Sequence, residues 1–338
     1  MAMAAAGMTI AARSPHLSVA AQTGTTKPNI VLIFADDLGW KDTGFSGSDF
    51  YETPNLDRTA REGIIFTNAY ACAGNCAPSR ACLISGQYTP RHGVYAVGDT
   101  NRGPVNLMRM EPIPNNGALV PDNFTVAEAL KSAGYATGMF GKWHLANSKD
   151  TQPSAQGFDV ALQPGTQGGS DDPKHIYSIT KTVCEFIEKN KDRPFFCYVA
   201  HHAIHSGLEA RQATLEKFKA KTPGKQHSGA LYAACLYDLD DGVGILLKRL
   251  EELGLGKNTL VLFTSDNGGT PQSSQEPLRG SKGCYYEGGI RVPLIARWPG
   301  VISPGAVSDA PVSNVDFYPT FLDAAGASAP ADKILDGA

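Results

Sequence analysis

The sequence lacks two features that would place it among membrane or polyanion-binding proteins. It has no run of about 18 consecutive apolar residues, the length that a membrane-spanning helix needs. It also has no long block of like charge, because 30 Lys and Arg residues against 33 Asp and Glu residues leave a formal net charge of −3. These absences argue against a membrane span and against a nucleic-acid partner held by bulk electrostatics.

Zinc and dithiol patterns are missing as well. The chain has seven cysteines, but no two of them form a C-x-x-C pair. Internal repeats and coiled-coil heptads are absent too. The seven thiols are therefore expected to be buried and inert, unless one of them has a chemical role.

What the chain does have is enough material for a large core. Of its 338 residues 42% are hydrophobic, whereas 19% are charged, below the roughly 25% usual for soluble domains. The 36 glycines and 22 prolines indicate many sharp turns and long loops. The composition excludes disorder as the main state and suits an enzyme with its site on loops.

The first 27 residues differ from the rest. An alanine-rich apolar stretch is followed by small residues, as in an export signal, although Arg13 follows the apolar part instead of preceding it. A disordered tail is the alternative. On the first interpretation the mature protein is periplasmic or secreted.

Short apolar runs alternate with helical patterns over the rest of the chain. Residues 29–35 and 259–264 are continuous apolar runs, as in strands buried on both faces, and 194–200 and 292–298 are further strand candidates. Thr125 to Glu128 form a capping box that opens a helix closed by Gly134, and residues 230–253 have helical spacing. This order predicts an α/β fold with a mainly parallel sheet sandwiched by helices.

Polar residues follow the two clearest strands directly. Asp36 and Asp37 come after the first run, and Asp266 and Asn267 follow the run at 259–264. If the strands are neighbours, these oxygens converge at the carboxyl edge of the sheet, where α/β proteins bind ligands. A donor set of hard oxygens favours Ca²⁺ or Mg²⁺ over zinc. Turn and capping roles are the alternative for either pair alone.

The segment from Cys76 to Arg80 reads C-A-P-S-R. Pro78 suits the first position of a helix, which would put Cys76 at or just before a helix N-terminus and Arg80 in the first turn, where it could bind an oxyanion. From these residues alone, Cys76 is either an activated thiol or a buried structural cysteine.

This segment resembles the signature of the type I sulfatases, formylglycine-dependent members of the alkaline-phosphatase-like superfamily. Further segments are similar to sulfatase motifs and occur in the same order: P-N-I-V-L-I-F-A-D-D-L-G-W from Pro28, G-K-W-H from Gly141, S-D-N-G from Ser265 and G-S-K-G-x-x-x-E-G-G-I-R-V-P from Gly280. Ser85 departs from the pattern, since many members have Thr there. Together the motifs span most of the chain and are highly specific.

The resemblance implies a role for each matching position. One Ca²⁺ would be bound by Asp36, Asp37, Asp266, Asn267 and Cys76, the last after its oxidation to formylglycine. Arg80, Lys142 and Lys282 would hold the sulfate group and the formylglycine hydrate, with Lys142, Lys282 and His205 contacting the substrate. His144 would orient the hydrate, and His205 would act near the leaving oxygen.

The resemblance also implies a domain division. We expect residues 28–325 to form the sulfatase catalytic domain and 326–338 to begin a truncated C-terminal region. Since relatives continue into a smaller domain, we expect this chain to lack that domain.

The expected function is a sulfuric ester hydrolase acting on a sulfated carbohydrate or an aryl sulfate. A formylglycine-generating enzyme is the partner expected for maturation. Two alternatives remain open: a phosphoester or phosphonate ester hydrolase of the same superfamily, and a non-catalytic relative that binds sulfated glycans.

Overall fold

A computed structural model describes residues 27–101 and 103–338. The predicted export signal at residues 1–27 therefore lies outside the described residues, apart from Lys27. No helix in the described part of the chain combines the length and the apolar character needed to cross a bilayer.

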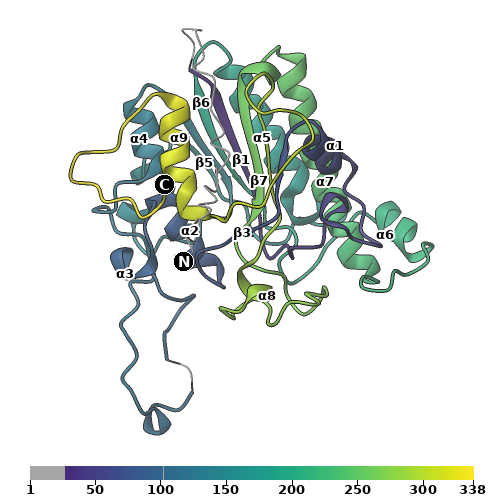
Figure 1. Cartoon of the computed structure of the whole chain (residues 1–338), viewed down its shortest axis with the longest axis horizontal. Helices are drawn as coiled ribbons and strands as arrows, with labels where there is room; N and C mark the ends of the chain where they lie inside the picture. Colours follow the sequence, from purple (N-terminus) through teal and green to yellow (C-terminus); the bar gives the residue numbers. More distant parts are fainter. Residues whose placement is uncertain (1–26, 102) are drawn as a thin grey trace, which may run out of the picture.

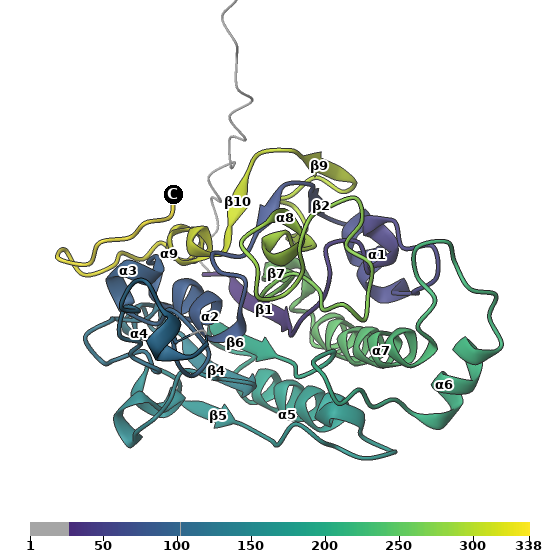
Figure 2. The ribbon, with the colours of Figure 1, turned by 90° about the horizontal axis from the view of Figure 1, so that it is seen from below.

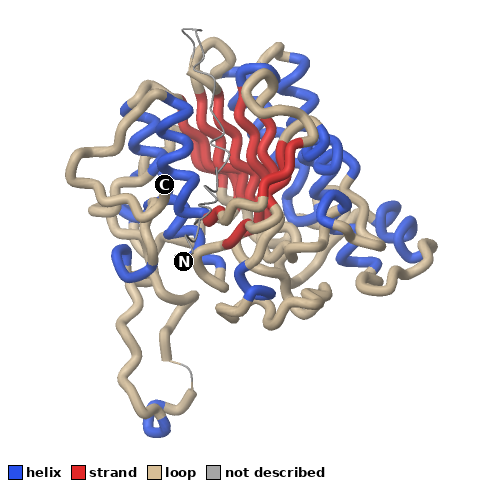
Figure 3. Tube along the Cα trace, in the orientation of Figure 1, coloured by secondary structure: helices blue, strands red, loops and turns tan. Residues whose placement is uncertain are grey.

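The centre of the molecule is an eight-stranded sheet (Figure 3). Its strand order is β5-β4-β6-β1-β7-β8-β2-β9. All neighbouring pairs are parallel except those that β8 makes with β7 and β2. The strands are β1 (Asn29–Ala35), β2 (Ile64–Phe66), β4 (Ala136–Gly141), β5 (Val160–Leu162), β6 (Phe195–Ala200), β7 (Thr259–Ser265), β8 (Leu294–Arg297) and β9 (Ala306–Ser308). A separate parallel pair joins β3 (Ala69–Tyr70) to β10 (Val312–Ser313).

Helices cover both faces of the sheet, so the predicted α/β sandwich is confirmed (Figures 1 and 2). One face carries α2 (Cys76–Ser85), α4 (Val126–Ser132) and α9 (Phe317–Ala325). The other carries α1 (Pro54–Arg61), α5 (Ile176–Lys189), α6 (Gln212–Lys219) and α7 (Ala230–Glu252). Two short helices, α3 (Thr89–His92) and α8 (Glu287–Ile290), lie in the connections.

The apolar run of β1 is continuous because both of its faces are buried. Ile30, Leu32 and Phe34 pack in the core under α2, α4 and α9, while Val31 and Ile33 pack in the core under α5 and α7. Successive side chains of a strand point to opposite faces, so a strand between two helical layers needs apolar residues at every position. This strand lies between β6 and β7, in the middle of the sheet.

The predicted elements are found at or close to their expected bounds. Thr125 Oγ1 accepts a hydrogen bond from the Glu128 amide at 3.1 Å, and Glu128 Oε2 accepts one from the Thr125 amide at 2.7 Å, which is the capping box at the start of α4. The predicted strand at 292–298 is the shorter, antiparallel β8.

Two segments extend from this body. The loop between α3 and α4 projects from the end of the sheet at which the parallel strands terminate (Figure 1). Residues 326–338 run back to α2 and α3, where the Asp336 amide donates to the Gly86 carbonyl at 2.9 Å and Arg91 pairs with the Asp336 carboxylate at 2.8 Å.

Candidate active site

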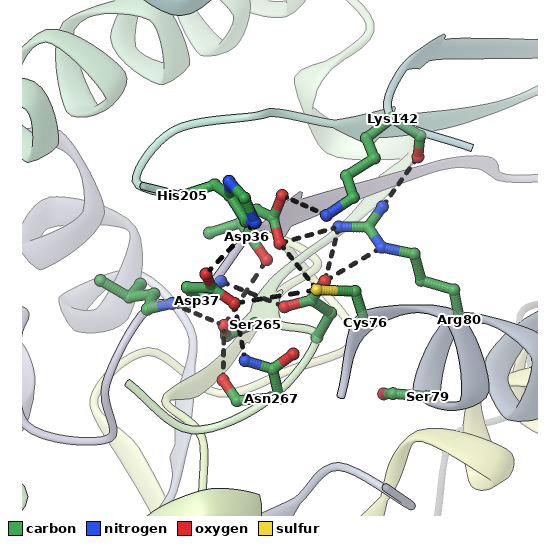
Figure 4. Close-up of polar contacts among 12 residues, drawn as sticks. Asp36, Asp37, Cys76, Ser79, Arg80, Lys142, His205, Ser265 and Asn267 are labelled. Atoms are coloured by element: carbon green, nitrogen blue, oxygen red, sulfur yellow. Dashed lines mark hydrogen bonds and ion pairs between the residues drawn. The ribbon is translucent and has the colours of Figure 1, made fainter. Parts of the chain in front are cut away.

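The two acidic clusters meet, as the sequence predicted. β1 and β7 are parallel neighbours in which Ala35 pairs with Ser265, so the residues that follow them leave the sheet side by side. The Asp37 amide donates to Asp266 Oδ1 at 3.1 Å, and Asn267 Nδ2 donates to Asp37 Oδ1 at 2.8 Å (Figure 4). All of these side chains are buried.

Helix α2 brings Cys76 to the same point. The helix begins at Cys76, so Pro78 is its third residue and the predicted first position of Pro78 is wrong by two residues. The Cys76 Sγ lies 3.4 Å from Asp36 Oδ1 and 3.8 Å from Asp37 Oδ1. One potential ligand atom from each of Asp36, Asp37, Cys76 and Asp266 lies within 4.8 Å of the others.

The surroundings of Cys76 do not activate its thiol. Burial raises the pKa of Cys76, and the carboxylates of Asp266 and Asp36 raise it further. Three nearby carboxylates outweigh the favourable end of one helix dipole, which acts only over the first turn. These surroundings favour the protonated thiol of Cys76 over the thiolate.

Arg80 is fully buried and binds a carboxylate of the protein itself. Its Nη2 and Nε donate to Asp266 Oδ2 at 2.7 and 3.0 Å, and its Nη1 donates to the carbonyl of Lys142 at 2.8 Å and to the Tyr198 hydroxyl at 3.3 Å. The guanidinium thus connects the ends of β7, β4 and β6. In this structure it holds Asp266 in place and supplies positive charge beside Cys76.

Two lysines neutralise the remaining carboxylates. Lys142 Nζ lies 2.7 Å from Asp36 Oδ2, and Lys282 Nζ lies 2.7 Å from Asp37 Oδ2. Burial alone would raise the pKa of Asp36, but Lys142 and Arg80 outweigh it and lower that pKa. Although burial opposes it, the charges of Cys76 and Asp37 raise the pKa of Lys282.

The two predicted histidines lie at the more open side of the cluster. His205 follows β6, is 32% exposed, and places its Nε2 3.9 Å from Asp37 Oδ2. Partial burial lowers the pKa of His205, and the positive charge of Lys142 acts in the same direction. His144 has a left-handed backbone, with φ of 62°, and an exposed surface.

Comparison with known proteins decides what this arrangement is. The family model described as "Sulfatase" matches residues 28–327. The chain belongs to the sulfatase family.

Individual sulfatases match over most of this chain. A sulfatase of Formosa agariphila is 36% identical over 92% of the chain and 71% of its own length, and N-acetylgalactosamine-6-sulfatase of Mus musculus is 35% identical over 92% and 65%. The crystal structure of Ps i-CgsB matches with a TM-score of 0.81 and 32% identity, over 92% of this chain and 75% of that one. The same protein has been solved with k-i-k-neocarrahexaose. The fold is the alkaline-phosphatase-like fold, and the chain spans about two thirds of the mouse relative.

The sulfatase site fits a hard divalent cation. Asn267 Oδ1 is buried and has no hydrogen-bond partner within the described structure, as expected of an oxygen that a cation would satisfy. Burial and the charge of Asp36 raise the pKa of Asp266 to about 7, so the ionised form of this carboxyl is less stable here than in water. A bound cation would relieve both conditions.

Two positioning residues of the sulfatase site escaped sequence analysis. The Tyr198 hydroxyl accepts a hydrogen bond from Arg80, and the Ser265 hydroxyl accepts one from the Leu38 amide at 2.9 Å while donating to the Asn267 carbonyl at 2.9 Å. Tyr198 carries the one polar side-chain oxygen of the strand segment F-F-C-Y-V-A, which was the available signal. Ser265 begins the S-D-N-G motif, but the motif assigned it no role.

Proposed function

We propose that the protein hydrolyses a sulfate monoester of a carbohydrate or an aryl alcohol to the free alcohol and inorganic sulfate. The observation that carries this proposal is the burial of Cys76 among Asp36, Asp37 and Asp266, with two lysines beside them. Relatives named N-acetylgalactosamine-6-sulfatase and a relative crystallised with neocarrahexaose favour a sulfated carbohydrate as the substrate.

The proposal includes a Ca²⁺ ion and a modified Cys76. Asp36, Asp37, Asp266 and Asn267 would hold the ion, with position 76 as a further oxygen ligand once it is formylglycine; a thiol is a soft donor and fits such a site poorly. A hydrated aldehyde at position 76 would offer one hydroxyl as nucleophile towards sulfur and a second whose deprotonation releases sulfate and restores the aldehyde, and Ca²⁺ would supply Lewis acidity.

The cationic side chains would bind the sulfate group. Lys142 follows β4 and pairs with Asp36, while Lys282 lies in the loop before α8 and pairs with Asp37. Fixed ammonium groups in a partly dry site stabilise the negative charge of equatorial sulfate oxygens without reorganising. Arg80 would add a further positive charge near the sulfate group while holding Asp266 in place.

The histidines would move protons. The lowered pKa of His205 keeps its ring largely neutral at pH 7, so that it can accept a proton, and makes the protonated ring a stronger acid towards the leaving oxygen. His144, an exposed residue two positions after Lys142, would orient the hydrate at position 76.

Replacing Cys76 tests this function directly. Wild-type protein and the Cys76→Ala variant would be produced with a formylglycine-generating enzyme and assayed with an aryl sulfate and with sulfated oligosaccharides in the presence of Ca²⁺. We expect turnover only in the wild type, with equal circular dichroism spectra, because position 76 supplies the nucleophile. Cys284→Ala, a matched variant of a partly exposed cysteine, should retain activity.

Three results would contradict the proposal. Activity in Cys76→Ala would show that position 76 does not supply the nucleophile, and faster turnover of an aryl phosphate than of the aryl sulfate would favour a phosphoester hydrolase. The paired lysines favour the sulfate, since single positive charges match a singly charged ester. An unmodified thiol at Cys76, found by peptide mass spectrometry, would favour a glycan-binding relative.

A further inference from the structure

The turn that follows β6 and carries His205 is anchored on two sides. On the first side it is bound to the backbone of the carboxylate cluster. The Asp36 amide donates a hydrogen bond to the Ala203 carbonyl at 3.1 Å, and the Ile204 amide donates to the Asp36 carbonyl at 3.0 Å. The His205 amide then closes the turn by donating to the His202 carbonyl at 2.9 Å. The residues before His205 are therefore fixed to the strand end that bears the carboxylates.

A buried lysine holds the second side of this turn. Lys174 lies in the loop before α5, is fully buried, and has a left-handed backbone with φ of 54°. Its Nζ donates to the Ser206 carbonyl at 3.1 Å, and no carboxylate in the described part of the chain forms an ion pair with this ammonium. A single carbonyl bond offsets little of the cost of burying an ammonium, so stability alone does not explain Lys174.

Glu209 binds the end of the same turn to the loop that contains Lys174. Its Oε2 accepts hydrogen bonds from the amides of Gly168, Gly169 and Lys174 at 2.8, 3.2 and 2.9 Å. Burial alone would raise the pKa of Glu209, but these bonds outweigh it and lower that pKa, so the carboxylate is charged at pH 7. The chain from Ser206 to Glu209 is therefore attached to one loop at both of its ends.

Ser206 extends this anchoring to the ring of His205. The Ser206 Oγ lies within hydrogen-bond distance of His205 Nδ1, at 3.3 Å. The other ring nitrogen, Nε2, lies 3.9 Å from Asp37 Oδ2 (Figure 4). A hydrogen bond at one nitrogen of an imidazole fixes the direction of the other and the proton that it carries. Ser206 thus directs Nε2 towards the cluster.

We propose that Ser206 and Lys174 are positioning residues for His205 in sulfate ester hydrolysis, an inference that rests on the proposed function. Ser206 holds the ring through Nδ1, and Lys174 holds Ser206. As the bond between sulfur and the leaving oxygen breaks, the proton on Nε2 passes to that oxygen. The proton on Nδ1 stays in place, and Ser206 Oγ accepts a hydrogen bond from it. Without either residue, His205 would be present but free to rotate away from the leaving oxygen.

Aryl sulfates with different leaving groups test this role in the matured protein with Ca²⁺. The phenolate of nitrophenyl sulfate leaves without help, whereas the more basic phenolate of phenyl sulfate needs a proton. With phenyl sulfate, Ser206→Ala should lower kcat roughly tenfold and Lys174→Met up to about 100-fold, with little change in KM, because a misplaced acid slows the chemical step and not binding. Both variants should affect nitrophenyl sulfate much less.

Combined and matched variants separate positioning from general support of the fold. If Ser206 acts only through His205, adding Ser206→Ala to His205→Gln should cause no further loss of kcat. Ser206→Thr keeps the hydroxyl and should restore most of the rate. Two controls should retain the full rate: Ser303→Ala, in the connection after β8 at the opposite edge of the sheet, and Lys181→Met, an exposed lysine of α5.

Nuclear magnetic resonance tests the contact without turnover. In protein made with ¹⁵N-labelled histidine, the ring signals of His205 are those that are missing from His205→Gln. These signals should shift in Ser206→Ala, because Nδ1 loses its partner, and also in Lys174→Met, while those of His92 should not change. The measurement needs neither a modified Cys76 nor a substrate, so its result does not depend on the proposed function.

Three results would overturn the proposal. Unchanged ring signals of His205 in Ser206→Ala would show that the hydroxyl does not hold the ring. A further loss of kcat on adding Ser206→Ala to His205→Gln would show an effect independent of His205. Equal losses on both aryl sulfates would show that the variants disturb the whole site. By contrast, absence of turnover in the matured wild type, with His205 signals that respond as expected, would contradict the proposed function and leave the contact between Ser206 and His205 standing.

Discussion

At the residue scale, buried histidines give the molecule a dependence on pH that is separate from its chemistry. His92 is 1% exposed, and burial lowers its pKa from 6.5 to about 4. The unfolded chain therefore binds this proton more tightly than the folded one. The free energy of unfolding is therefore unaffected by this titration above pH 6.5 and decreases as the pH falls from 6.5 towards 4.

We expect His92 to account for about 3 kcal/mol of the loss in unfolding free energy between pH 6.5 and pH 4. The measurement is urea denaturation at several pH values for the wild type and His92→Gln. The variant should have a shallower slope in this window, whatever its stability at pH 7. Parallel slopes would show that His92 titrates alike in the folded and unfolded states.

Some features of the site were predictable from the sequence, and others were not. Asp36, Asp37, Asp266 and Asn267 were predictable because they directly follow apolar runs and parallel strands end at one edge. The raised pKa of Cys76 was not predictable, because it depends on burial and on three carboxylates brought together from two distant segments.

At the element scale, one glycine sets the end of β4. Gly141 has φ of 109°, and a Cβ there would overlap the carbonyl oxygen of Ala200, which accepts a hydrogen bond from the Lys142 amide at 2.7 Å. Gly134 also has a positive φ, of 92°, but faces open space. Substituting each of these two glycines therefore distinguishes the cost of backbone strain, present at both, from the cost of steric overlap, present only at Gly141.

Gly141→Ala should lower the unfolding free energy by roughly 2–4 kcal/mol, because overpacking adds to the strain of the left-handed backbone. Gly134→Ala should cost about 1 kcal/mol, from strain alone. Guanidinium denaturation of both variants makes the comparison. Equal losses would mean that β4 and β6 separate easily at this point.

The capping box of α4 provides a second test at this scale. Thr125 Oγ1 accepts from the Glu128 amide and donates to the Gln156 carbonyl at 2.8 Å, so its loss leaves two buried groups unpaired. Thr125→Ala should lower the unfolding free energy by about 2 kcal/mol, the upper end for an N-cap. Thr125→Ser keeps the hydroxyl and should be nearly neutral in the same denaturation experiment; a loss as large as that of Ala would assign the effect to the methyl group.

Elements with a local pattern were predictable, whereas irregular segments were not. The strands β1 and β7 and the helices α4 and α7 have clear apolar runs or caps. The antiparallel direction of β8 depends on the path of the preceding connection, which carries no periodic pattern.

At the scale of the whole molecule, the cluster at the carboxyl edge should couple stability to metal. A ligand that binds only the folded state at 100 times its Kd adds about 2.7 kcal/mol. At about 2.1 cal/mol/K of unfolding entropy per residue, this corresponds to roughly 4 °C in Tm for a chain of this length. We therefore expect Ca²⁺ to raise the Tm of chelator-treated protein by several degrees, measured by calorimetry.

Two variants control this measurement. Asp37→Asn removes a buried oxygen charge from the cluster and should greatly reduce the shift, while Asp309→Asn, an exposed carboxylate on a loop, should leave it intact. A shift of equal size in Asp37→Asn would place the Ca²⁺ elsewhere.

The burial of Cys76 limits when this residue can be modified during folding. In the finished fold its side chain is 2% exposed, and the pocket around it closes only when β7, which follows it by more than half the chain, has paired with β1. If a separate enzyme converts this cysteine, conversion and folding compete for the same nascent chain. A variant that folds faster would then yield a larger share of well-ordered but inert molecules, and slow growth at low temperature would yield fewer.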